Sequence, residues 1–118
     1  MASMTDYAQR RLSAAQRGAF NAPVTAFITD AQLVACCCFG VTHAHLKANT
    51  SGRFQDGHRI RTSDVIKVEY SGGYWNVHTE SGSHYVIATF NRRGGRQSLD
   101  TFLAFQKRGV HATAARFH

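Results

Sequence analysis

Apolar and polar residues alternate most regularly between residues 60 and 90, where two glycine-bearing dipeptides divide the stretch into three short runs. Strict alternation is the pattern of a half-buried β-strand. Gly72-Gly73 and Ser81-Gly82 can both supply the positive φ that two-residue hairpin turns favour. The sequence therefore predicts a three-stranded antiparallel meander with a turn at each dipeptide.

These two turns determine which residues pair and divide the side chains of the meander between two faces. Val77 is expected to pair with Val68 and Val86, and Thr79 with Ile66. One face is apolar and is expected to form the core: Ile66, Val68, Tyr70, Trp75, Val77, Val86, Ala88 and Phe90. The other face is mixed polar and aromatic, and is expected to be exposed: Lys67, Glu69, Tyr74, Asn76, His78, Tyr85 and Ile87.

Helices are predicted near both ends of the chain. Residues 5–17 are good helix formers with Thr5 as a cap, and their thin apolar stripe predicts weak docking. Ser98 is placed to cap a second helix from Leu99 to Arg108, with Leu99, Phe102 and Leu103 as its buried stripe. Between the helices, residues 24–39 predict one or two strands with a turn at "TDAQ", and residues 46–57 predict a loop.

Together these elements predict an α+β domain: a bent antiparallel β-meander or small half-open barrel, with a C-terminal helix packed on it and a short N-terminal helix. The 118 residues are expected to form one domain. Residues 1–18 comprise a tag remnant (Met1-Ala2-Ser3) and the first helix, residues 19–109 the compact domain, and residues 110–118 a loose tail.

Charge adds a preference for an anionic partner. The chain has 14 Lys and Arg against 7 Asp and Glu, a formal net charge of +7. No run of 18 apolar residues and no secretion signal is found, so a cytoplasmic protein without a membrane partner is expected.

The stretch "NRRGGRQ", residues 91–97, sets three arginines around two glycines. We expect a mobile cationic loop whose guanidinium groups fit phosphates or protein carboxylates. On the mixed face of the meander, aromatic rings would provide a stacking platform for unpaired bases. The predicted binding residues are Arg92, Arg93, Arg96, Lys67, Tyr74, Asn76, His78 and Tyr85.

Three consecutive cysteines, residues 36–38, precede a His-x-His pair. Alternation on a strand places Cys36 and Cys38 on one face, and His43 and His45 could complete a zinc-type quartet. The usual Cys-x2-4-Cys spacing is absent and Gly40 would have to bend the chain sharply. Buried packing of the sulfur atoms is the favoured interpretation, over a metal site and over a reactive thiol, so no cofactor or metal is expected.

Seven histidines raise the alternative of acid–base catalysis, with His58, His78 or His84 as candidates. No Gly-x-Ser-x-Gly, His-Glu-x-x-His or phosphate-binding loop accompanies them. No catalytic residue is therefore predicted, and a non-enzymatic role is favoured.

The segment from residue 53 to residue 87 resembles small uncharacterised proteins of proteobacterial phages and mobile elements, with their "DG-x-x-I-x-T-S" and "T-x-S-G-S-x-Y" patterns. The resemblance implies a setting in which small proteins occupy a surface on a host complex, as anti-CRISPR proteins do. We therefore expect an inhibitor of a host defence protein or ribonucleoprotein complex in the bacterial cytoplasm. A direct RNA- or DNA-binding module is the first alternative, and a small His-dependent hydrolase or nuclease is the second.

Overall fold

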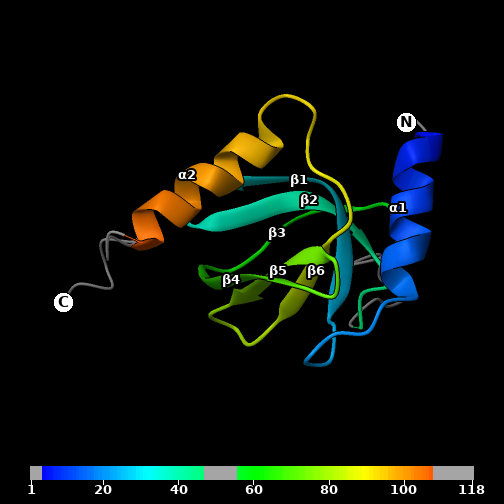
Figure 1. Ribbon diagram of the computed structural model, residues 1–118, viewed down its shortest axis with the longest axis horizontal. Helices are drawn as coiled ribbons and strands as arrows, with labels where there is room; N and C mark the ends of the chain where they lie inside the picture. The colour runs from blue at the N-terminus through cyan, green and yellow to red at the C-terminus, as the bar shows by residue number, and fades with distance from the viewer. Residues whose placement is uncertain (1–3, 47–55, 108–118) are drawn as a thin grey trace.

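The computed structural model describes residues 4–46 and 56–107. In these residues two helices flank one open six-stranded sheet with the strand order β3-β2-β1-β6-β5-β4, which confirms the predicted α+β fold (Figure 1). The elements are α1 (Asp6–Gln16), β1 (Ala26–Val34), β2 (Cys37–His43), β3 (Arg59–Arg61), β4 (Val65–Ser71), β5 (Tyr74–Thr79), β6 (His84–Ile87) and α2 (Gly95–Lys107).

The sheet is mixed rather than purely antiparallel. The predicted meander forms β4, β5 and β6, and the β1–β2 hairpin joins it by pairing β1 parallel to β6. Ala26 pairs with Tyr85 and Ile28 with Ile87 in this parallel ladder. The strands at the N-terminal end of the sequence thereby continue the same sheet.

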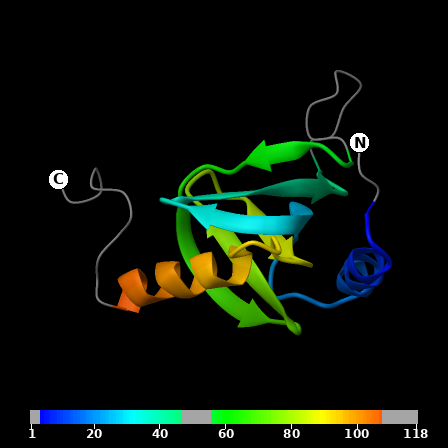
Figure 2. The same cartoon turned by 90° about the horizontal axis from the view of Figure 1, so that it is seen from above.

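The connection between β3 and β4 forces this sheet to curl. The two strands occupy opposite edges, which in a flat six-stranded sheet would be about 24 Å apart, at about 4.8 Å per strand spacing. Residues 62–64 join them, and the chain from Arg61 to Val65 can span at most about 14 Å. The edges must therefore approach each other, and Figure 2 shows the resulting curvature. The amide of Val65 donates to the Cys36 carbonyl at 2.7 Å, close to where β2 begins.

The two helices cover opposite faces of the sheet. The α2 face contains the larger apolar cluster, in which Leu99 and Phe102 pack with Ile28, Val77 and Ile87. The α1 face is smaller: Ala15, Leu12, Tyr74, Val86 and Ala88 are buried there. Figure 1 shows the helices at opposite ends of the molecule. The Thr5 hydroxyl accepts from the Ala8 amide at 3.1 Å, as predicted for the N-cap of α1.

The first predicted turn is confirmed. Gly72 and Gly73 have φ of 64° and 85°, and Val68 pairs with Val77. A β-bulge between Val65 and Lys67 then places Val65, rather than the predicted Ile66, opposite Thr79.

The second predicted turn is wrong by one residue. The Thr79 amide donates to the Ser83 carbonyl, so the loop has three residues and ends at Gly82 in the left-handed region (φ 88°). A shift of one residue moves every side chain of β6 to the other face. Val77 therefore pairs with Tyr85, and the predicted partner Val86 points toward α1.

The predicted turn at "TDAQ" is also wrong, because β1 continues through it. The β1–β2 register shifts at a β-bulge between Thr29 and Gln32, where Asp30 has a φ of 58°. The Asp30 carboxylate accepts hydrogen bonds from the Arg59 guanidinium at 2.9 Å and from the side-chain amide of Asn91 at 3.0 Å. These contacts compensate for the unusual backbone and hold β3 and the turn before α2 against β1.

The segment predicted as a mobile loop is an ordered helix entry. Asn91 organises it: the side-chain Oδ1 accepts from the Arg93 amide at 2.8 Å and the carbonyl accepts from the Gly95 amide at 3.0 Å. The α2 helix therefore begins at Gly95 and not after Ser98. The Ser98 hydroxyl lies inside the helix, where it donates to the Gly95 carbonyl and accepts from the Leu33 amide.

Two expectations lie largely outside the described residues, namely most of the predicted loop at 46–57 and the predicted tail at 110–118. Among the residues described, neither helix is both long enough and apolar enough to cross a membrane.

We expect Gly40→Ala to destabilise the protein by about 1–3 kcal/mol, because the added methyl group would press on the Ile28 side chain and lie 2.9 Å from the Thr29 carbonyl oxygen. Urea denaturation followed by tryptophan fluorescence measures the change. An unaltered midpoint would show that β1 and β2 are not packed as closely as described.

Candidate functional site

A pair of aromatic rings, the exposed Tyr70 and the half-buried Trp75, lies on the α2 face of the sheet. Tyr70 in β4 and Trp75 in β5 face each other across the Gly72-Gly73 turn, with ring centroids 5.1 Å apart and planes at 68°. The Tyr70 hydroxyl donates to the Gly73 carbonyl at 3.1 Å. Tyr70 was expected in the core, yet 62% of its surface is exposed because β4 is the edge strand.

Arg96, in the first turn of α2, extends this aromatic pair. Its guanidinium carbon lies 5.3 Å from the centre of the Trp75 ring, within cation–π range. Its Nε donates to Asp100 at 3.2 Å, an ion pair one helical turn further along. The guanidinium group is thus oriented over the tryptophan.

Ile66 completes the apolar part of this region. The side chain is 45% exposed, and the Ile66 carbonyl accepts a 3.4 Å hydrogen bond from Gln106 in the last turn of α2. We call the region formed by Ile66, Tyr70, Trp75 and Arg96 the α2–β4 surface. Arg92 and Arg93 are exposed in the turn that leads into α2.

The predicted aromatic platform on the other face is not formed. Tyr74 is buried beneath α1, where the Arg11 guanidinium lies 4.4 Å above its ring and Phe20 contacts it edge-on. The register shift in β6 turns Tyr85 to the α2 face, where it is buried beside His45. Neither ring is accessible to a nucleic-acid base.

Asn76 and His84 form a buried polar network instead of a binding face. The Asn76 amide nitrogen donates to the Ser71 and Tyr74 carbonyls, which leaves Oδ1 facing His84 Nε2 at 2.6 Å. The Pro23 carbonyl lies 3.0 Å from His84 Nδ1. Because both ring nitrogens are in contact with acceptors, His84 could exchange a proton with a substrate only by losing one of these contacts.

His78 and Lys67 lie at the surface of the same face and share one acidic partner. Glu69 contacts His78 Nε2 at 2.7 Å and the Lys67 ammonium at 3.8 Å. The hydrogen bond with His78 is the main cause that lowers the pKa of the Glu69 carboxyl. The His78 ring stacks on His84 at a centroid distance of 4.5 Å. These residues are therefore separated from the arginines of the α2–β4 surface by the thickness of the sheet.

The cysteines behave in two ways. Cys38 is buried, as the packing interpretation predicts, and burial raises the pKa of its thiol to about 12. Cys36 and Cys37 are half-buried and lie next to Asp64. The alternative Cys/His quartet does not assemble among the described residues, where His43 is bonded to Thr29. No sequence signal connected Asp64 with the cysteines, which lie 27 residues or more before it.

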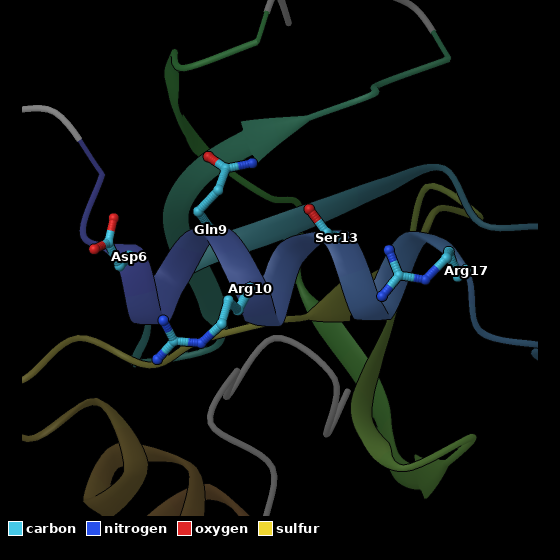
Figure 3. Close-up of a pocket in the computed structure, with 5 residues that line it drawn as sticks. All are labelled: Asp6, Gln9, Arg10, Ser13 and Arg17. Atoms are coloured by element: carbon cyan, nitrogen blue, oxygen red, sulfur yellow. The ribbon is translucent and has the colours of Figure 1, made fainter.

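A shallow hollow lies along α1, away from the residues considered so far (Figure 3). It is lined by Asp6, Gln9, Arg10, Ser13 and Arg17. Their spacing is that of one exposed helical face, so the hollow marks a solvated helix surface.

No protein-family model, curated protein or solved structure matches this chain. The function is therefore inferred from the geometry of the described residues. Of the eight predicted binding residues, Arg92, Arg93 and Arg96 lie at or beside the α2–β4 surface, Lys67 and His78 lie on the opposite face, and Tyr74, Asn76 and Tyr85 are buried.

We expect acidification to destabilise the protein. Burial is the main cause that lowers the pKa of His43 and of His84 below 6.5, so the folded chain binds these protons more weakly than the unfolded chain. The contribution to stability is complete above pH 6.5 and is lost as the pH falls through 6.5 toward the lower folded-state values. Urea denaturation between about pH 7.5 and pH 5.5 measures the slope.

His84→Gln should reduce this pH dependence whatever its effect on absolute stability, while Glu69 adds a further loss only below pH 4.5. Stability that stays constant or rises on acidification would contradict the lowered pKa of these two buried histidines.

Proposed function

We propose that this protein is a non-enzymatic binding protein and that a protein partner docks on its α2–β4 surface. The observation that carries the proposal is the exposed Tyr70 ring packed against the half-buried Trp75, with the Arg96 guanidinium above Trp75. Tyrosine, tryptophan and arginine are the residues that contribute most to binding energy in protein interfaces, usually from a centre of apolar contacts. Ile66, which is 45% exposed and precedes Tyr70 by four residues on β4, supplies an apolar side chain further along the same strand.

The packing of the rings favours a protein over unpaired bases as the partner. Stacking of bases requires open ring faces. The Trp75 ring already packs against Tyr70 in a T-shaped pair and contacts the guanidinium of Arg96, and Arg96 is also paired with Asp100. A flat base would have to displace these contacts, whereas aliphatic side chains of a protein could pack around them.

The exposed arginines favour a partner that carries acidic groups around the apolar contact. Arg92 and Arg93 are exposed next to the start of α2, and the chain carries a net charge of +7. Complementary charge around an apolar contact accelerates association and fixes orientation. A nucleoprotein offers such a combination of protein surface and anionic groups. Inhibition of a host defence nucleoprotein complex, of the anti-CRISPR kind, is the specific form of this proposal.

We expect Tyr70→Ala to weaken capture of the partner at least about 10-fold, since the loss of one central aromatic side chain costs more than about 1.4 kcal/mol. The measurement is quantitative affinity capture of a defence nucleoprotein complex from a bacterial lysate. Tyr7→Ala is the matched control: Tyr7 is 59% exposed, against 62% for Tyr70, but lies on α1. Equal capture by both variants would exclude the α2–β4 surface.

We expect the double reversal Arg92→Glu and Arg93→Glu to slow association about 10-fold and to reduce its salt dependence. Arg10→Glu with Arg17→Glu changes the net charge equally on the α1 side and should have a smaller effect. Surface plasmon resonance at about 50 and 200 mM salt measures the rates. If the protein instead binds naked RNA or DNA tightly, with the same arginine dependence, it is a direct nucleic-acid-binding module.

A further inference from the structure

Two thiols and a carboxylate meet where the β1–β2 turn reaches β2. The Cys36 and Cys37 sulfur atoms are 4.0 Å apart. Asp64 Oδ1 lies 2.9 Å from Cys36 Sγ and 3.9 Å from Cys37 Sγ. The turn makes this possible, because Ala35 takes a φ of 53° and the alternation that would separate neighbouring side chains begins only at Cys37.

The backbone holds the three residues from both sides. The Val65 amide donates to the Cys36 carbonyl at 2.7 Å. The Thr62 amide donates to the Cys38 carbonyl at 2.9 Å, and the Thr62 hydroxyl accepts from the Cys38 amide at 3.0 Å. Asp64 is thus fixed beside the cysteines by the same short link that curls the sheet.

Two of the three separations between these ligand atoms match the edges of a tetrahedral zinc site. Zinc–sulfur bonds of about 2.3 Å and zinc–oxygen bonds of about 2.1 Å give tetrahedron edges of about 3.8 Å between sulfurs and about 3.6 Å between sulfur and oxygen. Two of the three observed separations, 4.0 and 3.9 Å, are close to these values. The third, 2.9 Å, is a thiol–carboxylate hydrogen bond, and metal binding, which removes the thiol proton, requires this distance to increase.

We propose that Cys36, Cys37 and Asp64 bind one thiophilic divalent cation, Zn²⁺, with water as the fourth ligand. Sulfur ligands select zinc or cadmium over magnesium and calcium. Binding breaks two S–H bonds, forms two Zn–S bonds and releases two protons to solvent, while the carboxylate oxygen completes the protein ligands. The ion would join the β1–β2 turn to the link between β3 and β4.

The test is a titration of the reduced, metal-free protein with Zn²⁺ in competition with a chromophoric chelator. We expect one equivalent bound, two protons released in weakly buffered solution, and a higher melting temperature with Zn²⁺. Cd²⁺ should give thiolate-to-metal charge-transfer absorbance in the ultraviolet. The absence of either one-to-one binding or the cadmium absorbance would overturn the proposal.

Single substitutions assign the ligands. Cys36→Ser and Cys37→Ser should each weaken binding at least about 10-fold and abolish most of the cadmium absorbance, and Asp64→Asn should weaken binding with the absorbance retained. Cys38→Ala is the matched control and should bind as the wild type does, because Cys38 is buried. Circular dichroism verifies that each variant is folded. If Cys38→Ala or His43→Gln abolishes binding while Cys36→Ser and Asp64→Asn do not, this ligand set is wrong.

Discussion

The short link between β3 and β4 is the constraint on which the rest of this structure depends. Three residues connect the two edges of a six-stranded sheet, so the sheet has to curl until those edges approach each other. One helix packs on each face of the curled sheet, and glycines lie where the backbone of one element approaches another closely. A methyl group on Gly95, for example, would collide with the Ala31 carbonyl. The entry of α2 is therefore determined by its fit against β1.

Curling also determines which polar groups meet. The link that bends the sheet carries Asp64 to the cysteines, and the edge position of β4 leaves Tyr70 and Ile66 uncovered beside α2. On the opposite face the helix α1 covers Tyr74, and a network from Pro23 through His84 to Asn76 fills the space beside it. The apolar and cationic α2–β4 surface therefore lies on one face of the sheet, and the buried polar network of His84 and Asn76 lies on the other.

Local patterns in the sequence predicted the fold class, both helices, the Gly72-Gly73 turn and the arginines near α2. They could not predict the β5–β6 register, because Ser81-Gly82 suits a two-residue turn and the last part of a three-residue loop equally well. That single residue exchanged the faces of Tyr85 and Val86 and removed Tyr85 from the expected platform, while α1 covers Tyr74, the other ring. The edge position of β4 and the contact of Asp64 with the cysteines depend on the order of the strands in the sheet. The alternation of apolar and polar residues does not encode that order.

The parallel pairing of β1 with β6 has a consequence for folding kinetics. The β1–β2 hairpin and the β4–β5–β6 meander are local, but Ala26 and Tyr85 are 59 positions apart in the sequence. Forming that ladder requires the closure of a long chain segment before any of its contacts are gained. We therefore expect docking of the β1–β2 hairpin onto the β4–β5–β6 meander to be the slow step of folding, with β6 as an unpaired edge strand until it occurs.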